Sequence, residues 1–470
     1  MNKLFQFKKK HLSSKNFFFE EDGSSYSYND LLKLSNNIVE SIPTRSVILL
    51  KSYNTFIWLS AYFGLIRKNI IPILLEPNID KNYERDLISR YKPSYIFSRY
   101  EEKYKKFNTV FKKNKFHVFK TNYETKNIKV NKSLRLLLTT SGTTGHKKFV
   151  KLSYENLYSN TFAIIDYLKI KKSDALITTL QPSYSYGLSL LNSHLQVGST
   201  IIFNDYSFID KKFWNLFTKY KPTTFACVPK SLEFLSRLNI KKINFKNIKY
   251  ITLAGGSLET AKLLDIYKAL FKKNIRLYTM YGQTEASPRI SYLDPKFNKS
   301  KIGSIGKPIK GGKLFLVDKK NKTIKHTNKI GELNYKGKNV FIGYSYSYKD
   351  LIKNKTNKNN ILKTGDYGYK DKQGFYWLVG RKKDFIKINS YRVNLKELND
   401  FFKFSGFQSH CTFLNNKINI YYENRKFVSF FKKSPIIKGN LSITNFCLIF
   451  KKKIPVNERG KINIKELTEK

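Results

Sequence analysis

Apolar and polar residues alternate in blocks along the first three quarters of the chain, and these blocks predict strands and helices in turn. Short apolar runs predict buried strands at Val47–Leu50, Ile70–Leu75, Leu134–Thr139, Ala175–Leu180, Thr200–Phe203, Phe225–Val228, Tyr250–Leu253 and Arg276–Met280. Helical spacing of apolar residues lies between many of them, for example over Tyr28–Ile42 and Asp210–Tyr220. Alternation of this kind predicts an α/β fold of layered subdomains with largely parallel strands.

The pattern changes near residue 300, where short glycine-rich segments replace the helical ones. Gly303–Gly306, Gly311-Gly312 and Gly331–Gly337 predict β-hairpins or a small β-barrel-like part. The polar, lysine-rich stretch Tyr344–Asn360 predicts an exposed loop.

From about residue 384 the chain has the pattern of a small α+β unit. Phe385–Ile388 and Tyr391–Val393 flank Asn389-Ser390, which predicts a two-residue hairpin. Asn394 is expected to start a helix, and Glu397 three residues later fits a capping box. Upstream, Asp371–Gly374 predicts a turn between two strands.

Composition limits the class of protein. The chain has 470 residues, of which 41% are hydrophobic, so it is long enough for more than one domain. No apolar run approaches the ~20 residues that span a bilayer, and the N-terminus lacks the apolar segment of a signal peptide. The three cysteines form no CxxC pair, so neither a disulfide framework nor a zinc site is expected. We therefore expect a cytoplasmic protein with no membrane span.

The net charge of +54, from 88 basic and 34 acidic residues, is the feature that most suggests nucleic acid as a partner. The lysines are spread along the whole length instead of forming an arm or stripe. Lys, Asn, Ile, Tyr and Phe are all abundant and all have A/T-rich codons, so base bias of the genome accounts for the charge. We expect no nucleic-acid partner, and a positive field that attracts anionic ligands.

One loop has the composition of a polyphosphate cradle. Residues 139–151 read TTSGTTGHKKFVK, directly after the apolar run Leu134–Leu138. Glycines let the backbone approach a phosphate, hydroxyl and backbone N–H groups donate hydrogen bonds, and lysine supplies charge. Ser153 then predicts a helix start, so the loop is expected between a buried strand and a helix. The spacing does not fit a Walker loop, and taken alone the segment could equally be a flexible surface turn.

Further short motifs follow in order, each with an ordinary structural alternative. Ala254-Gly255-Gly256 follows a predicted strand and would let a flat ligand lie against bare backbone. The sequence YGQTE at 281–285 offers an aromatic face for a base, a hydroxyl for phosphate and a carboxylate for Mg²⁺. Asp366, in TGD, offers an acceptor for ribose hydroxyls, and Arg381 and Lys461 are the remaining candidates. Singly, Tyr281 could be a core aromatic, Asp366 a turn residue and Lys461 one of many surface lysines.

The ordered set of motifs, with its spacing, resembles the adenylate-forming superfamily: acyl-CoA synthetases, aryl-CoA ligases, luciferases and adenylation domains of peptide synthetases. The resemblance runs from about Ser25 to the end of the chain. It implies a two-step ligase, in which a carboxylate and ATP give an acyl-adenylate and pyrophosphate, and a thiol of coenzyme A or of a carrier-protein phosphopantetheine then takes the acyl group. It also implies an AMP-binding domain over residues 1–382 and a small mobile lid domain over residues 383–470.

The resemblance assigns roles by position. Lys461 would bridge the carboxylate and the α-phosphate, Thr284 would touch that phosphate, Glu285 would hold Mg²⁺, and Lys383 would be the hinge of the lid. ATP would be held by residues of the phosphate loop, Thr140, Ser141, Gly142, Thr143, Thr144, Gly145 and Lys148. Adenine and ribose would contact Gly255, Gly256, Ser257, Tyr281, Gly282, Gln283, Asp366 and Arg381.

The acid and the acceptor are less constrained. Tyr184 takes the position of the family's gate beside the nucleotide, and Gly187 would admit the acyl group. No aspartate for an α-amino group follows, so a fatty or other simple acyl or aryl acid is the first choice, with an amino acid as the alternative. Ser390 replaces the family's glycine near the pantetheine tunnel, which leaves adenylation without thioester formation open. A homologue that binds nucleotide without turnover is the remaining alternative, against which the retained Lys461 argues.

Overall fold

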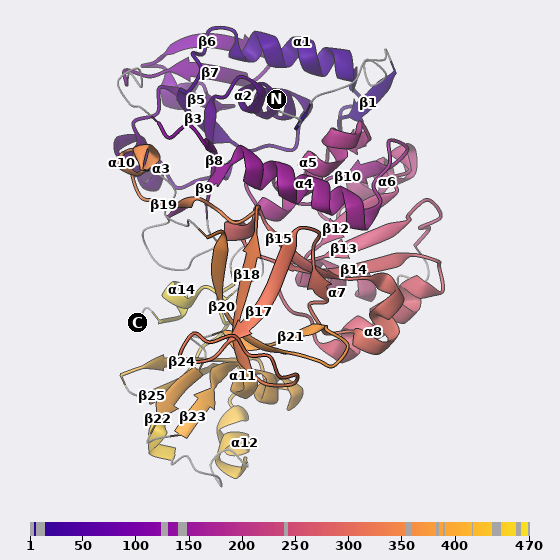
Figure 1. The fold of residues 1–470 in the computed structure, drawn as a ribbon, viewed down its shortest axis with the longest axis vertical. Coiled ribbons are helices and arrows are strands. Elements are labelled where there is room, and N and C mark those ends of the chain that lie inside the picture. Colours follow the sequence, from indigo (N-terminus) through magenta and orange to yellow (C-terminus); the bar gives the residue numbers. More distant parts are fainter. Residues whose placement is uncertain are drawn as a thin grey trace. The chain divides into compact units, whose positions relative to one another are not determined.

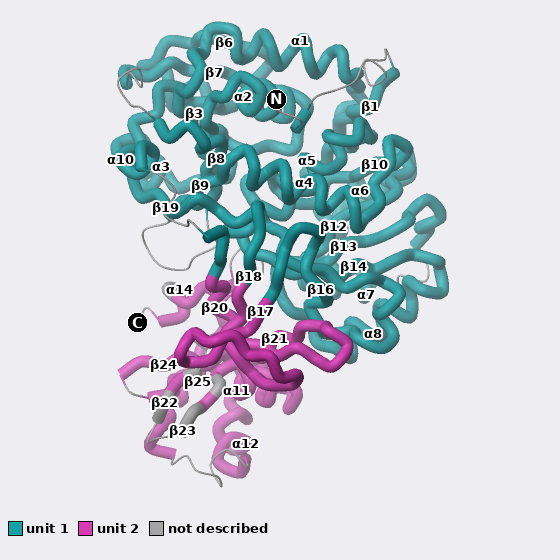
Figure 2. Tube along the Cα trace, viewed as in Figure 1, with its two compact units in different colours: residues 1–141, 146–314, 335–362 teal, residues 142–145, 315–334, 363–470 magenta. Residues whose placement is uncertain are grey.

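The computed structural model describes residues 4–5, 15–123, 130–139, 148–238, 243–353, 359–381, 385–388, 391–415, 417–434, 443–456 and 462–468. The chain forms two compact units (Figure 2). Unit 1 contains residues 1–141, 146–314 and 335–362, and unit 2 takes in residues 315–334 and 363–470. This division differs from the boundary expected after residue 382, and the two-domain boundary itself stays a prediction.

The first layer of unit 1 is an eight-stranded sheet in the order β19-β9-β8-β4-β3-β5-β7-β6 (Figure 1). Its central strands are parallel, and antiparallel strands extend it at both edges. The strands are β3 (Val47–Lys51), β4 (Ile71–Leu75), β5 (Tyr95–Ser98), β6 (Asn108–Lys113), β7 (Phe116–Lys120), β8 (Leu134–Thr139), β9 (Phe149–Ser153) and β19 (Gly343–Ser345). The helices of these segments are α1 (Tyr28–Val39), α2 (Phe56–Arg67), α3 (Lys81–Tyr91) and α10 (Lys349–Ile352). Helix α2 packs on α1 and is buried from Phe56 to Ile66, which explains why its sequence is apolar on every face.

The second layer of unit 1 is a nine-stranded sheet in the order β16-β15-β14-β13-β12-β10-β11-β1-β2. Strands β10 to β14 pair in parallel, and β15 returns antiparallel to β14. The strands are β1 (Asn16–Phe19), β2 (Ser25–Ser27), β10 (Ala175–Ile177), β11 (Thr200–Ile202), β12 (Thr224–Cys227), β13 (Tyr250–Leu253), β14 (Arg276–Gly282), β15 (Arg289–Leu293) and β16 (Lys307–Pro308). The helices are α4 (Tyr154–Leu168), α5 (Ser185–Val197), α6 (Lys211–Tyr220), α7 (Pro229–Arg237), α8 (Thr260–Phe271) and α9 (Asn298–Lys301). Helices α4 and α5 pack against one another (Figure 1).

A four-stranded sheet in the order β17-β18-β20-β21 follows the α/β layers, where the glycine-rich segments predicted a β-rich part. Its strands are β17 (Gly312–Val317), β18 (Gly331–Gly337), β20 (Ile361–Lys370) and β21 (Tyr376–Arg381). The rest of unit 2 holds the hairpin β22 (Phe385–Ile388) and β23 (Tyr391–Asn394), the sheet β24 (Ser409–Leu414), β25 (Lys417–Tyr422) and β26 (Phe446–Phe450), and the helices α11 (Leu395–Phe404), α12 (Phe427–Lys433) and α14 (Ile464–Thr468). Phe402, Phe427 and Phe431 are fully buried among them.

Most predicted elements are present, and the predicted α/β class is confirmed. Leu134–Thr139 and Tyr250–Leu253 are strands with the expected bounds, and the turn at Asp371–Gly374 joins β20 to β21 as expected. The expectation of an exposed loop over Tyr344–Asn360 is wrong for its first part. Strand β19 and helix α10 lie there, and Leu351 is fully buried.

The helix after the phosphate loop starts where it was expected, but the segment before it is not loop. The Ser153 hydroxyl accepts a hydrogen bond from the Asn156 amide, and the Asn156 side chain accepts one from the Ser153 amide at 2.8 Å. This capping box fixes the N-terminus of α4. Residues 149–153 form strand β9, antiparallel to β8. The loop therefore joins two strands, and the expected placement between a strand and a helix is wrong.

Among the residues that the structure describes, no helix combines the length and the apolar character needed to cross a membrane.

Candidate active site

The segment YGQTE ends strand β14 and turns at once into a short 3₁₀ helix, Thr284–Ala286. The Gln283 amide donates a hydrogen bond to the Pro288 carbonyl at 2.9 Å, which closes this turn. A Cβ atom at Gly282 would lie 2.1 Å from the same carbonyl oxygen. Residue 282 must therefore be glycine for the turn to form, and the turn sets the positions of Thr284 and Glu285.

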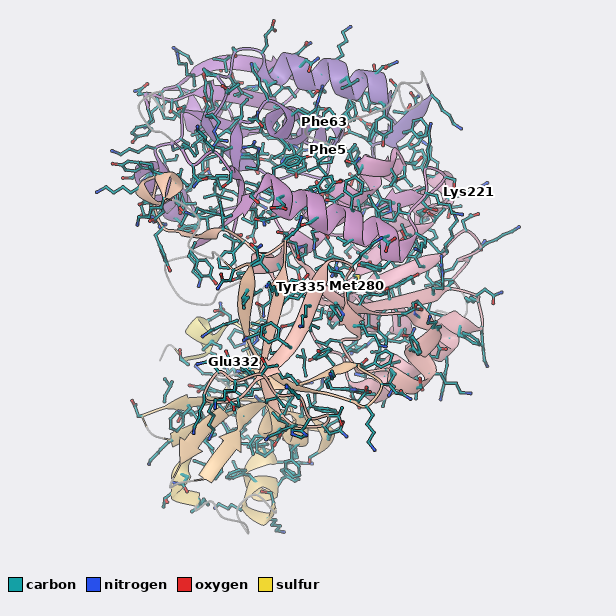
Figure 3. All side chains as sticks on the ribbon, in the orientation of Figure 1. Phe5, Phe63, Lys221, Met280, Glu332 and Tyr335 are labelled. Atoms are coloured by element: carbon teal, nitrogen blue, oxygen red, sulfur yellow. The ribbon has the colours of Figure 1, made fainter. Side chains whose placement is uncertain are left out.

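Two buried asparagines hold the backbone of this turn. The side-chain amide of Asn339 donates to the carbonyls of Ala286 and Arg289 at 2.6 and 2.7 Å. The Asn160 amide donates to the same two carbonyls at 3.3 and 3.1 Å. The Tyr335 hydroxyl donates to the Asn339 side chain at 2.8 Å and fixes its orientation; Tyr335 is labelled in Figure 3. Buried polar groups that satisfy one another in this way keep a turn rigid.

Glu285 and Lys148 meet at one tyrosine. The Tyr344 hydroxyl donates a hydrogen bond to Glu285 Oε1 at 2.9 Å, and Lys148 Nζ lies 3.5 Å from the centroid of the Tyr344 ring. Strand β19 carries Tyr344 and pairs antiparallel with β9, which begins just after Lys148. Burial, and next the Glu285 carboxylate, raise the pKa of Tyr344, so its hydroxyl remains a donor. The structure thus brings the last residue of the phosphate loop next to the carboxylate of YGQTE.

Thr284 contacts the start of helix α5. Its hydroxyl lies 3.2 Å from the hydroxyl of Ser185, the first residue of that helix. A Cβ atom at Gly187 would lie 2.5 Å from the Gln181 carbonyl oxygen, so the missing side chain accommodates the backbone before the helix. The expected role of Gly187 toward an acyl group stays a prediction.

The Ala-Gly-Gly segment meets Tyr184. Gly255 has a φ of +93°, and a Cβ atom there would lie 2.5 Å from the Tyr184 hydroxyl oxygen. Glycine is thus required at residue 255 by its backbone conformation and by the tyrosine above it. Gly256 and Ser257 are exposed, and Gln283 donates to the Tyr281 hydroxyl at 3.4 Å. Tyr184, Gly255 and the YGQTE segment all belong to unit 1.

Asp366 and Arg381 lie together in unit 2. They are directly opposite one another on strands β20 and β21. Arg381 Nε lies 3.4 Å from Asp366 Oδ1, with the aspartate side chain 6% exposed and the arginine 57%. The Asp366 amide donates to the Thr364 hydroxyl at 3.1 Å. The hairpin therefore presents a buried carboxylate beside an exposed guanidinium.

Several predicted site residues lie outside the described residues: Thr140, Ser141, Gly142, Thr143, Thr144, Gly145, Lys383, Ser390 and Lys461. Sequence reasoning missed Tyr344, Ser185, Asn160 and Asn339. Nothing in the local sequence marks them, because each acquires its contact through a strand or helix distant in the chain.

The chain is similar to known proteins over more than half of its length. A family model described as "AMP-binding enzyme" matches residues 6–345. Oxalate–CoA ligase of Saccharomyces cerevisiae is 31% identical over 265 residues, which cover 56% of this chain and 47% of the relative. 2-Succinylbenzoate–CoA ligase of Oceanobacillus iheyensis is 32% identical over 251 residues, which cover 53% of this chain and 50% of the relative. The chain thus spans about half the length of the curated relatives it matches.

Solved structures share the fold over the full chain. O-succinylbenzoate coenzyme A synthetase (MenE) from Bacillus subtilis, in complex with AMP, has a TM-score of 0.79 at 19% identity and covers 100% of this chain and 98% of its own. ATP-bound MatB from Rhodopseudomonas palustris has a TM-score of 0.76 at 17% identity, with 99% and 98% covered. At 19% and 17% identity, this similarity shows that the fold is shared and does not extend to substrate or activity.

Proposed function

Because the chain belongs to the AMP-binding enzyme family, we propose that it is an ATP-dependent acid–thiol ligase that forms an acyl-AMP intermediate. Membership confirms the expected resemblance to adenylate-forming enzymes. The observation that carries the proposal is the cluster in unit 1, where Lys148 and Glu285 meet at Tyr344. A cation and a carboxylate held side by side suit the phosphates of ATP and their metal ion.

In the first step a carboxylate oxygen of the acid attacks the α-phosphorus of ATP. The bond from that phosphorus to the oxygen bridging the β-phosphate breaks, and pyrophosphate leaves. Negative charge concentrates on the phosphoryl oxygens, so positioned donors and cations lower the barrier. We assign Lys148 and the loop at 140–145 to the β- and γ-phosphates, the Thr284 hydroxyl to the α-phosphate, and Lys461 to the attacking carboxylate and the α-phosphate together.

Mg²⁺ fits the residues present. Magnesium in nucleotide sites usually takes one or two carboxylates, with phosphate oxygens and waters as the other ligands. Glu285 is a half-buried carboxylate, and within the described residues Tyr344 is its one side-chain hydrogen-bond partner. No group of three acidic, histidine or cysteine side chains gathers in the described part of the chain, as an all-protein metal cage would need. When bound, the ion would neutralise phosphate charge, and Glu285 would hold it.

Asp366 and Arg381 suit the ribose. A carboxylate that is 6% exposed and held by its own hairpin is a preorganised acceptor for vicinal hydroxyls. Gly255, Gly256, Ser257, Tyr281, Gly282 and Gln283 are proposed for adenine and its neighbourhood. A lid domain from residue 383, with Lys383 as hinge, is proposed from the family resemblance.

In the second step the thiol attacks the acyl carbon, the bond to the AMP oxygen breaks, and AMP leaves while the thiol proton is released. Coenzyme A is the acceptor we propose first, because the relatives are named as CoA ligases; a carrier-protein pantetheine is the other. Tyr184 lies between Gly255 and helix α5 and is proposed as the gate to the acid. The panel of acids to test includes oxalate and 2-succinylbenzoate, because two of the relatives are named for these acids.

ATP–pyrophosphate exchange tests the proposal. We expect Mg²⁺-dependent exchange driven by at least one acid of a broad carboxylic-acid panel, and its loss in Lys461→Ala and Glu285→Gln. Tyr346→Phe, an exposed tyrosine close to Tyr344 in the chain, is the matched control and should exchange like the parent. Absence of exchange with every acid, amino acids included, would refute the proposed function. Thioester formation with coenzyme A is measured separately, because Ser390 bears on that step alone.

A further inference from the structure

Arg289 is a buried cation immediately beyond the YGQTE turn. It is the first residue of β15, pairs with Gly282 on β14, and is 1% exposed. Its backbone is fixed by the amides of Asn160 and Asn339. The turn that positions Thr284 and Glu285 thus also fixes where the Arg289 side chain begins.

The guanidinium of Arg289 has no anion to balance it in the described part of the chain. Its central carbon lies 5.0 Å from the centroid of the Tyr186 ring, and its Nε has no hydrogen-bond partner. No carboxylate among the described residues forms an ion pair with it. Burial of a charge costs free energy unless the charge is paired or hydrogen-bonded.

Other buried cations of unit 1 are compensated. Lys51 Nζ, fully buried, lies 2.8 Å from Glu84 Oε1. Lys151, 1% exposed, donates to the carbonyl of Asp350 at 2.7 Å. Arg289 differs from both, since its partners are two neutral tyrosines: the ring of Tyr186 and the side chain of Tyr167.

The nearby tyrosines do not supply the missing charge. Burial raises the pKa of Tyr167 to about 12 and that of Tyr186 well above its ordinary value, so both are neutral at pH 7. The Tyr186 hydroxyl donates to Thr252 at 2.7 Å, and the Tyr167 hydroxyl donates to the sulfur of Met280 at 2.9 Å; Met280 is labelled in Figure 3. Tyr167 also shares a side-chain hydrogen bond with Arg289, but as a neutral group it does not balance the charge. The partner that fits Arg289 is therefore an anion that the described side chains do not provide.

The position of Arg289 connects it with the acid side of the proposed site. Tyr186, the ring beneath the guanidinium, follows Ser185, whose hydroxyl lies 3.2 Å from that of Thr284. Tyr184, one residue earlier, lies against Gly255. We propose that Arg289 binds a second carboxylate of the acid, so that the enzyme activates a dicarboxylic acid at its other end. This inference rests on the proposed function and names its substrate class.

The chemistry favours a carboxylate at this position. A guanidinium offers a planar pair of N–H donors that matches the two oxygens of a carboxylate. The reacting carboxylate is assigned to the α-phosphate beside Thr284, so an anion at Arg289 belongs to another part of the molecule. An uncharged alkyl or aryl tail would leave the buried cation without a counter-ion.

The test compares acids of equal length in ATP–pyrophosphate exchange: succinate with butyrate, glutarate with valerate, and adipate with hexanoate. We expect the parent to have a kcat/KM at least 100-fold higher for the best dicarboxylate than for its monocarboxylate partner. Arg289→Met should lose that preference through KM for the dicarboxylate, and Arg289→Lys should keep part of it. Arg276→Met is the matched control, since that exposed arginine also packs over tyrosine rings, at 5.7 and 6.0 Å, and its preference should not change.

Two readouts keep the inference separate from the proposed function and from folding. Exchange with monocarboxylates alone would overturn the inference and leave the ligase standing. If no acid supports exchange, the proposed ligase function is refuted. Calorimetric titration of succinate into the parent and into Arg289→Met then tests the carboxylate site alone. Binding that depends on Arg289 supports the inference, and equal or absent binding overturns it. Because Arg289 has no counter-ion among the described residues, Arg289→Met should melt no lower than the parent in the absence of acid.

Discussion

Replacing Tyr344 by phenylalanine tests whether the Glu285 carboxylate is held for ATP and its metal ion. The substitution removes the hydroxyl that donates to Glu285 Oε1 at 2.9 Å and keeps the ring that lies 3.5 Å from Lys148 Nζ. A hydrogen bond to a charged group contributes about 1.5–3 kcal/mol. Glu285 is only half-buried, so water replaces part of that bond and the net loss should be about 1–2 kcal/mol.

That loss predicts a rise of about 5- to 30-fold in the KM for ATP at limiting Mg²⁺. The KM for the acid should change little, because the lost hydroxyl contacts Glu285, which is proposed to bind the metal ion and not the acid. Tyr344→Leu also removes the ring beneath Lys148, and the lost cation–π contact of about 0.5–2 kcal/mol should raise the KM for ATP further. Tyr346→Phe, with its side chain 51% exposed, is the control.

The assay is ATP–pyrophosphate exchange at saturating acid, with ATP and Mg²⁺ each varied at several fixed levels of the other. If Tyr344→Phe changes the KM for ATP by less than twofold at every Mg²⁺ level, the carboxylate is not held by this hydroxyl. If it raises the KM for the acid instead, Glu285 has been assigned to the wrong substrate.

Two further predictions concern the scaffold of the site. Burial lowers the pKa of His194 from 6.5 to about 4, so the unfolded chain binds its proton first as the pH falls. The contribution of neutral His194 to the free energy of unfolding should be complete above pH 6.5. It should decrease by about 3 kcal/mol between pH 6.5 and 4, at about 1.4 kcal/mol per pH unit. Urea unfolding of His194→Leu should lack that decrease, whereas His326→Gln, a change at an exposed histidine, should keep it. Gly282→Ala places a Cβ atom 2.1 Å from the Pro288 carbonyl oxygen, so it should destabilise unit 1 by about 1–3 kcal/mol and weaken ATP binding. An unchanged melting temperature and an unchanged KM for ATP would show that the turn does not depend on this glycine.

Local pattern predicted the strands and helices well where burial and sequence agree. The run Leu134–Thr139 gives a strand with the expected bounds because a central strand covered on both faces has an apolar sequence. Strand β9 was missed because it contains Lys151, a residue type expected at the surface. In the structure that lysine is 1% exposed, and carbonyls of the segment after β19 accept its hydrogen bonds. No feature of the sequence near residue 151 indicates those hydrogen-bond partners.

The same distinction applies to the site. Gly255 and Gly282 of the ordered motifs could be predicted because the close backbone approaches there demand glycine, and the phosphate and metal roles of the acidic residues stay predictions. Tyr344 was assigned to an exposed loop, yet it is the residue at which Lys148 and Glu285 meet. Its role follows from the pairing of β19 with β9, and Arg289 likewise became notable only once its burial was visible. Pairing between distant segments and the absence of a counter-ion are tertiary facts that a single sequence does not contain.

In the proposed first step, a carboxylate oxygen of the acid becomes bonded to the α-phosphorus of ATP. The direct test is turnover of an acid labelled with ¹⁸O in its carboxylate, in the presence of coenzyme A. Mass spectrometry then determines which products carry the label. The acyl-adenylate route predicts AMP that carries one ¹⁸O atom, unlabelled pyrophosphate, and no ADP. Label in inorganic phosphate with formation of ADP, or AMP without label, would contradict it.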